Sequence, residues 1–127
     1  MKIVLDTSVF VDYTRAKLGP LPFLINLAKQ KRAILYVPSV VILELWAGAS
    51  MVAQAEQRSA KKLMGGMKIV ELTRQLAEKA GELSRQSRVE DFIDASVAAT
   101  ALYLDAELAT ANKKHFEKVR GLKLFKN

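Results

Sequence analysis

Three acidic residues of this chain lie in apolar surroundings, where a carboxylate is unusual. Asp6 follows the apolar residues 3–5, Glu44 lies within the apolar segment 40–48, and Asp94 lies within residues 91–102. An acid is almost never buried without a partner, because removing its charge from water costs a large amount of free energy. If these three acids are buried, a positive charge must compensate them.

The neighbouring sequence does not supply that positive charge. No Lys or Arg occurs between Ala33 and Gln57, or between Val89 and Asn112. A divalent cation would compensate several acids at once, and carboxylates and water are the ligands that Mg²⁺ and Mn²⁺ prefer. We therefore expect Asp6, Glu44 and Asp94 to converge on a metal site.

Each acid also has a purely structural explanation. Asp6 could cap the N-terminus of the first helix, and Glu44 could lie on the exposed side of a half-buried helix. Asp94 could be a first-turn acid that interacts favourably with a helix dipole, with Asp91 as the N-cap. The metal hypothesis depends on the three acids together rather than on any one of them.

The composition limits the chemistry to oxygen and amine groups. The chain has no cysteine, which excludes disulfides, a thiol nucleophile and a thiolate zinc site. Its only histidine, His115, cannot form a histidine-rich metal site, and we expect it to be a surface or packing residue rather than a catalyst. Carboxylates are therefore the best candidates for a reactive site.

The charge is strongly basic, with 20 Lys and Arg against 13 Asp and Glu and a net charge of +7. Basic side chains concentrate in residues 113–126 and at residues 29–32. They suit an anionic partner such as nucleic acid, although a solvated charged surface is an equally good explanation. The apolar runs are too short or too polar to span a bilayer, and no cleavable leader is visible, so we expect a soluble, cytoplasmic protein.

Apolar patterns, caps and breakers predict alternating strands and helices. Strands are expected at residues 3–5, 33–37, 68–72, 107–110 and 122–125. Helices are expected at residues 8–16, 21–31, 40–49, 51–64, 74–87 and 92–104, with Ser39, Thr73 and Asp91 as N-caps.

This alternation favours a single domain, residues 1–127, built on a parallel sheet covered on both faces. Ligands of such sheets bind beyond the carboxyl ends of the strands, and Asp6 lies at such an end. The predicted topology therefore supports a functional site around Asp6.

Four segments resemble the motifs of VapC-type PIN-domain ribonucleases, the toxins of VapBC toxin–antitoxin pairs. The segments occur in order and span nearly the whole chain: residues 5–12 (LDTSVFVD), 44–48 (ELWAG), 94–101 (DASVAATA) and 108–116 (LATANKKHF). Each motif is modest, but the four together are a strong signal.

The resemblance implies a three-layer α/β/α fold with a five-stranded parallel sheet of order 3-2-1-4-5 and a Mg²⁺- or Mn²⁺-dependent endoribonuclease. By the motif match, Asp6, Glu44 and Asp94 are metal ligands, and Thr110 is a hydroxyl residue beside them. Many family members have a fourth acid where this chain has Asn112, which leaves one negative charge fewer for a second metal. An amide oxygen at Asn112 can still bind metal or orient water.

The same resemblance implies the partners. The substrate is RNA, and a VapB-type antitoxin inhibits the enzyme by inserting a segment into the metal pocket. The helical region 40–64 is implied to form a homodimer and part of the antitoxin groove.

Three other functions remain open. Because of Asn112, the chain could be a non-catalytic PIN-like module that binds RNA or protein, or it could be an RNA-processing PIN nuclease outside a toxin–antitoxin system. A phosphatase-like or receiver-like domain could use Asp6 as nucleophile. The expected second aspartate is absent, however, because Ser8 stands two residues after Asp6.

Overall fold

The protein forms one five-stranded parallel sheet of order β3-β2-β1-β4-β5, as predicted. A computed structural model describes residues 1–126. The strands are β1 (Lys2–Leu5), β2 (Ile34–Pro38), β3 (Lys68–Val70), β4 (Glu107–Ala109) and β5 (Lys123–Leu124). In the register of the central strands, Val4 of β1 lies opposite Tyr36 of β2 and Leu108 of β4.

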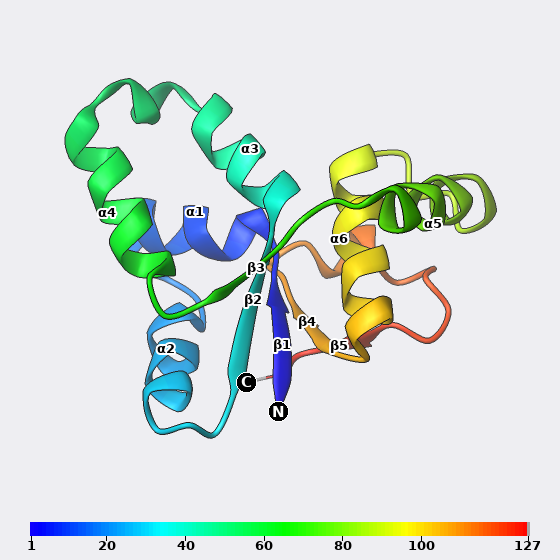
Figure 1. Cartoon of the computed structure of the whole chain (residues 1–127), viewed down its shortest axis with the longest axis horizontal. Helices are drawn as coiled ribbons and strands as arrows, with labels where there is room; N and C mark the ends of the chain where they lie inside the picture. Colours follow the sequence, from blue (N-terminus) through cyan, green and yellow to red (C-terminus); the bar gives the residue numbers. More distant parts are fainter. Residues whose placement is uncertain (127) are drawn as a thin grey trace.

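Helices cover both faces of this sheet (Figure 1). They are α1 (Thr7–Ala16), α2 (Leu21–Lys29), α3 (Ser39–Ala47), α4 (Gln54–Met64), α5 (Arg74–Gln86) and α6 (Phe92–Leu104), with short 3₁₀ turns η1 (Ala49–Val52) and η2 (Lys113–His115). Helices α1, α2 and α4 lie on one side of the sheet and α5 and α6 on the other. Helix α3 contacts both α1 and α6 near the carboxyl ends of the strands. The predicted three-layer α/β/α architecture is confirmed.

The core lies between the sheet and the two helical layers. Ile3, Val4 and Leu5 are fully buried, because helices cover both faces of the central strand. Helix α6 packs against β1 with a nearly continuous buried run that begins at Ala95 and is rich in alanine. Its small side chains let the helix lie close to the sheet, which holds the first turn of α6 near the end of β1.

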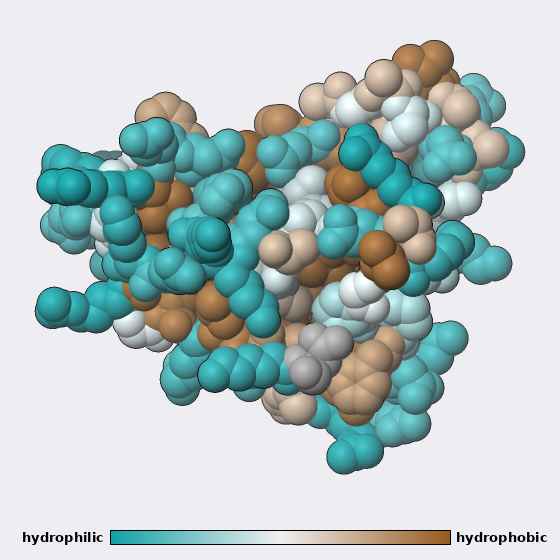
Figure 2. Space-filling view, turned by 180° about the vertical axis from the view of Figure 1, so that it is seen from behind, coloured by the Kyte–Doolittle hydropathy of each residue, from teal (hydrophilic) through white to brown (hydrophobic). Residues whose placement is uncertain are grey.

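The outer surface is mainly hydrophilic on the face opposite to that of Figure 1, with apolar side chains in separate areas (Figure 2). Among residues 1–126, no helix is both long and apolar enough to cross a membrane.

Two local predictions need correction. Ser39 does not cap α3; it is the first residue of the helix, and its Oγ accepts a hydrogen bond from the Leu72 N–H at 3.0 Å. It thereby ties the segment after β3 to the start of α3. The helix expected over residues 51–64 is divided into η1 and α4, because Ala53 has an extended backbone conformation between them. The predicted caps Thr73 and Asp91 are confirmed.

Candidate metal centre

One cavity of about 770 Å³ lies beyond the carboxyl ends of β1 and β4 and collects much of the negative charge of this basic protein. Six carboxylates line it: Asp6, Asp12, Glu44, Glu56, Asp91 and Asp94. Arg15 is the only Lys or Arg among the residues that line this cavity. So many acids around one solvent-filled space create a strongly negative potential that attracts cations.

Asp6 is the buried member of this group, with 2% of its surface exposed. It occupies the N-cap position of α1, but its side chain does not cap the helix. Its Oδ2 atom instead accepts hydrogen bonds from Ser8 Oγ at 2.8 Å and from Thr110 Oγ1 at 2.7 Å. Two donors on one oxygen fix the orientation of the carboxylate, so the N-cap explanation of Asp6 does not hold for its side chain.

The loop after β4 is bonded to the same hydroxyl groups. The Ala111 N–H donates to Ser8 Oγ at 2.9 Å, and the Asn112 N–H donates to Thr110 Oγ1 at 2.9 Å. Sequence analysis anticipated Thr110 beside the acids but did not single out Ser8. The available signal was its position in the first motif, two residues after Asp6, where a hydroxyl can reach back to the carboxylate.

Asp94 approaches Asp6 from the first turn of α6. Its N–H donates to the Asp91 carboxylate at 3.0 Å, which confirms Asp91 as the helix cap and fixes the start of α6. Burial of the Asp94 carboxyl, together with the nearby negative charges of Asp6 and Asp91, raises its pKa from 3.8 to about 6, and His115 opposes the shift. The surroundings of Asp94 therefore disfavour its negative charge, which a bound cation would stabilise.

His115 contacts this acid directly, with 3.0 Å between its Nδ1 and the Asp94 Oδ2. The His115 side chain is 57% exposed and lines the cavity, so the expected surface location is correct. Sequence analysis did not anticipate its contact with Asp94. These residues are 21 positions apart, and only the fold brings η2 beside the start of α6.

Glu44 and Asn112 line the same cavity from two other segments, α3 and the loop after β4. Both residues are exposed, so Glu44 follows the alternative of an exposed residue on a half-buried helix. Only Asp6 is buried among the three predicted acids, because α3 projects beyond the sheet and leaves Glu44 open to the cavity. The carboxylate of Glu44 is therefore solvated and does not need a positive charge to compensate it.

The donor set fits a hydrated cation rather than a closed protein cage. Among residues 1–126, no three acidic or histidine side chains lie close enough to hold an ion by themselves. Mg²⁺ retains several waters and typically uses only one or two carboxylates, so the electrostatically coupled pair Asp6 and Asp94 suffices. The buried Thr7 Oγ1, which has no hydrogen-bond partner within the described chain, belongs to a residue that lines the cavity. Such an oxygen marks a place for an ordered water.

Comparison with known proteins identifies the family. The PIN-domain family matches residues 3–122. Ribonuclease VapC19 of Mycobacterium tuberculosis is 30% identical over 120 residues, covering 91% of this chain and 92% of VapC19.

Solved structures give the same fold. The DNA-bound VapBC structure from Salmonella typhimurium has a TM-score of 0.82 at 20% identity, covering 98% of this chain and 97% of that one. VapBC2 from Rickettsia felis, bound to a promoter DNA fragment, has a TM-score of 0.79 at 24% identity, with 98% of both chains covered.

Nucleases of this family generally depend on a metal ion, in agreement with the acidic cavity. The family match also decides against the phosphatase-like and receiver-like alternatives. Each of the four segments that resemble PIN-domain motifs contributes at least one residue to the lining of the acidic cavity. This chain therefore belongs to the PIN-domain family.

Proposed function

We propose that this protein is a Mg²⁺- or Mn²⁺-dependent endoribonuclease that acts as the VapC-type toxin of a toxin–antitoxin pair. One observation carries the proposal: six carboxylates line a single cavity of a protein whose net charge is +7. RNA is an anion and would be repelled by this cavity alone. A bound cation removes that conflict, and the named relative VapC19 is a ribonuclease.

The residues of the chain divide the work between binding and orientation. Asp6 and Asp94 are the proposed direct ligands, whereas Glu44, which was also expected to be a ligand, and Asn112 would orient water from the other walls of the cavity. Ser8 and Thr110 orient Asp6 through the two hydrogen bonds to its Oδ2. When bound, the metal ion lowers the pKa of a bound water molecule and neutralises charge on the attacked phosphate.

The proposed reaction is hydrolysis of a phosphodiester bond. The oxygen of a water molecule forms a bond to phosphorus, and the bond from phosphorus to the 3′-oxygen breaks. The attacking water releases a proton to solvent and the departing 3′-oxygen takes one up, so the products are a 5′-phosphate and a 3′-hydroxyl. His115 is the only histidine that lines the cavity, and its Nδ1 contacts Asp94 instead of being free to act as a general base. The carboxylates therefore act by holding and orienting the water molecule.

The decisive experiment measures RNA cleavage with and without Mn²⁺ for the wild type, for Asp94→Asn and for Asp105→Asn. Asp105 is a matched control, because it is an exposed aspartate at the end of α6, away from the acidic cavity. We expect cleavage by the wild type and Asp105→Asn only when Mn²⁺ is present, and none by Asp94→Asn. Equal cleavage by all three proteins would refute the assignment.

The same experiment separates the principal alternative. A non-catalytic PIN-like module would bind RNA or Mn²⁺ without cleaving RNA, as could be expected if Asn112 weakens the site. An RNA-processing nuclease would cleave RNA but would not be inhibited by a partner. The product of a neighbouring small gene, added to the cleavage assay, distinguishes that alternative from a toxin.

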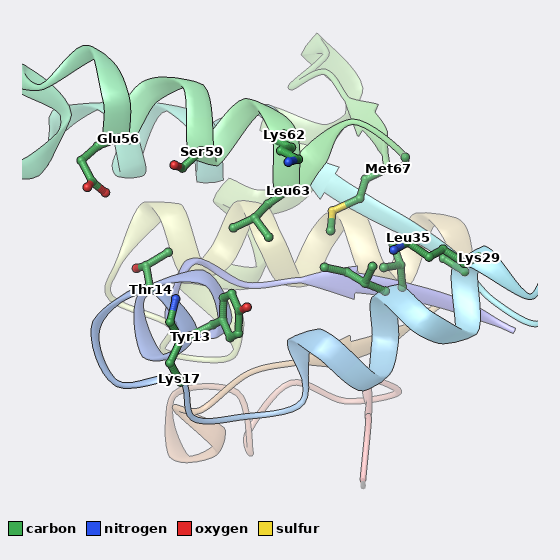
Figure 3. Close-up of a pocket in the computed structure, with 13 residues that line it drawn as sticks. Tyr13, Thr14, Lys17, Lys29, Leu35, Glu56, Ser59, Lys62, Leu63 and Met67 are labelled. Atoms are coloured by element: carbon green, nitrogen blue, oxygen red, sulfur yellow. The ribbon is translucent and has the colours of Figure 1, made fainter.

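A second cavity is the proposed docking place of the antitoxin (Figure 3). It has a volume of about 600 Å³ and lies between α1, α2 and α4, with Tyr13, Leu35, Leu63 and Met67 among its lining side chains. Thr14, Glu56, Ser59 and Leu63 line both this cavity and the acidic one.

The two cavities are therefore adjacent. A partner segment that packs its apolar side chains in the first can place a basic side chain in the second, where it would displace the cation and block RNA. The VapBC structures of Salmonella typhimurium and Rickettsia felis show that proteins with this fold pair with antitoxins.

We further propose that the protein is a cytoplasmic homodimer and that residues 1–127 form one domain. Support for the dimer comes from Leu43 of α3 and Val52 of η1, large apolar residues that are 62% and 87% exposed. Light scattering should give twice the monomer mass, and Leu43→Glu with Val52→Glu should reduce that mass to the monomer. A wild-type monomer at micromolar concentration would contradict the proposal.

A further inference from the structure

A smaller hollow adjoins the acidic cavity and has the opposite charge on part of its wall. Its volume is about 330 Å³, and it lies between the segment 87–91 and the region of η2. Asp91, Asp94 and His115 line both cavities. Arg88, Lys114 and Lys118 line only the smaller one. The cationic wall is therefore next to the proposed metal site but distinct from it.

The fold fixes two of these cations at the edge of the hollow. Phe116 and Val119 are buried in the core, so that the residues between and beside them, Lys114 and Lys118, remain at the surface. From the sequence, the basic segment 113–126 suited an anionic partner such as nucleic acid or a solvated surface, and no residue in it was distinguished from the others. In the structure, two lysines of this segment line the same hollow as Asp94. The sequence alone did not predict which lysines would do so.

Arg88 enters from the other side of the hollow. It follows the end of α5, has a left-handed backbone with φ of 55°, and is held by the buried Val89 after it. The left-handed conformation is an ordinary way to end a helix, and Lys17, Lys31 and Asp105 also adopt it in this chain. The conformation therefore does not single out Arg88; its position opposite Lys114 and Lys118 does.

The positive charges of the hollow are available to a ligand. Within residues 1–126, none of Arg88, Lys114 and Lys118 forms an ion pair within 4.0 Å, although Glu90 lines the same hollow. A cation bound at Asp94 would offset the acids on the shared wall. The remaining charge would then favour an anion.

We propose that Arg88, Lys114 and Lys118 form a subsite for the RNA phosphate next to the one that is cleaved. The inference rests on the proposed function. RNA carries a phosphate at every nucleotide, so a strand with one phosphate at the metal must bring the next phosphate to an adjoining site. An acidic protein segment has no such obligatory spacing. The charge polarity of the two cavities therefore matches a nucleic-acid backbone better than a protein.

The test is the salt dependence of binding for a labelled single-stranded oligoribonucleotide, measured with Ca²⁺ in place of Mn²⁺ so that a divalent cation is present beside the acidic wall, with the oligonucleotide verified as intact on a gel after each titration. The subsite variant is Arg88→Gly with Lys118→Gln. Glycine is the residue best suited to a positive φ, so this change removes the charge of Arg88 without disturbing the end of α5. An unchanged melting temperature will verify that the variant is folded.

The matched control is Lys61→Gln with Lys68→Gln, which removes the same charge. Both control residues are exposed and line neither the acidic cavity nor the smaller hollow. For single strands, each neutralised phosphate contributes about 0.7 to the slope of log affinity against log salt, so loss of this one phosphate site should lower the slope by about 0.7. Its affinity for RNA should fall several-fold at low salt, whereas the control should retain the wild-type slope.

Three results would overturn the subsite. The first is a wild-type slope for the subsite variant. The second is an equal loss of slope in both variants, which would indicate a general effect of charge. The third is unchanged RNA binding combined with lost binding to the acidic product of a neighbouring gene, which would assign the hollow to a protein partner.

The outcome also separates the subsite from the proposed function. If the wild type cleaves RNA and the slopes are equal, only the subsite fails. If the wild type cleaves no RNA under any metal condition but the slopes differ as expected, the proposed nuclease function fails and an RNA-binding site remains.

Discussion

The Nδ1 atom of His115 lies 3.0 Å from the Oδ2 atom of Asp94 and joins the loop after β4 to the first turn of α6. Outer hydrogen-bond partners of this kind orient metal-ligating carboxylates, and their loss typically weakens metal binding by roughly 10–100-fold. The contact uses one Asp94 oxygen, and Asp94 lines the acidic cavity. We therefore assign His115 the role of a positioning residue.

Two conservative replacements of His115 should behave differently. In His115→Asn, the side-chain amide nitrogen takes nearly the place of Nδ1 and can still donate to Asp94. In His115→Gln, the amide lies nearer the place of Nε2, so the bond is lost. We expect Mn²⁺ affinity, measured by calorimetry, to stay near the wild-type value for Asn and to fall about 10-fold or more for Gln. Equal affinities would remove His115 from the site.

Metal binding should depend on pH through Asp94. A proton competes with the cation for a carboxyl whose pKa is raised to about 6. Mn²⁺ affinity should therefore fall by up to about tenfold per pH unit below pH 6. Calorimetry between pH 5 and 7 gives this slope, and Asp94→Asn should abolish it in that range. A flat wild-type profile would contradict the prediction.

The same raised pKa affects the stability of the metal-free protein. The folded state binds the Asp94 proton more tightly than the unfolded state does, whose pKa is near 3.8. The stabilising contribution of this protonation is complete below about pH 3.8 and is lost as the pH rises through about 6. Urea unfolding of the wild type and Asp94→Asn should diverge in this range, and saturating Mn²⁺ should restore the stability of the wild type at pH 7. Parallel profiles would exclude a perturbed Asp94.

The hydroxyl of Thr110 should stabilise the fold as well as orient Asp6. Thr110→Val keeps the shape of the side chain but removes the donor to the buried Asp6 carboxylate. Loss of a hydrogen bond to a charged group costs about 1.5–3 kcal/mol in the free energy of unfolding, which urea denaturation measures. Thr110→Ser should recover most of the loss. A change below about 0.5 kcal/mol for Thr110→Val would show that the bond is not important.

Asp6→Asn tests how Asp6 acts on Asp94. An asparagine Oδ1 can still accept from Ser8 and Thr110, so the fold should persist. Because the negative charge of Asp6 raises the Asp94 pKa, its removal should lower that pKa, as NMR titration would show. Mn²⁺ affinity and RNA cleavage should nevertheless be lost. Cleavage by Asp6→Asn at the wild-type rate would exclude Asp6 as a ligand.

The fold was predictable because local patterns and long-range topology agree. The uninterrupted apolar residues 3–5 indicated a strand buried on both faces, and Ile3, Val4 and Leu5 are fully buried. The sheet order came from the family resemblance, since strand lengths alone do not specify which strands are neighbours. The break at Ala53 and the contact of Ser39 with Leu72 were missed, because tertiary packing rather than helix propensity decides both.

The site was predictable only in part. Asp6, Glu44 and Asp94 were expected to converge on a metal: all three line one cavity, and Asp6 and Asp94 lie near enough for their charges to interact, but within residues 1–126 the three do not form a cluster that could hold an ion by itself. The exposure of Glu44 matches one of the two explanations given for it, but the apolar segment alone did not decide between them, because such a helix can project beyond a sheet as well as lie against it. Ser8 and His115 were missed for different reasons: Ser8 resembles an ordinary first-turn residue, and the contact of His115 spans 21 positions.

The central claim is that Asp6 and Asp94 hold a cation at the end of β1. The most direct measurement is a crystal structure of the wild type soaked in Mn²⁺, with anomalous diffraction recorded at a wavelength where manganese scatters strongly. We predict an anomalous peak within coordination distance of a carboxylate oxygen of both residues, about 2.0–2.2 Å away, and no such peak in Asp94→Asn. A saturated crystal with no peak in the acidic cavity, or with a peak that persists in Asp94→Asn, would contradict the account.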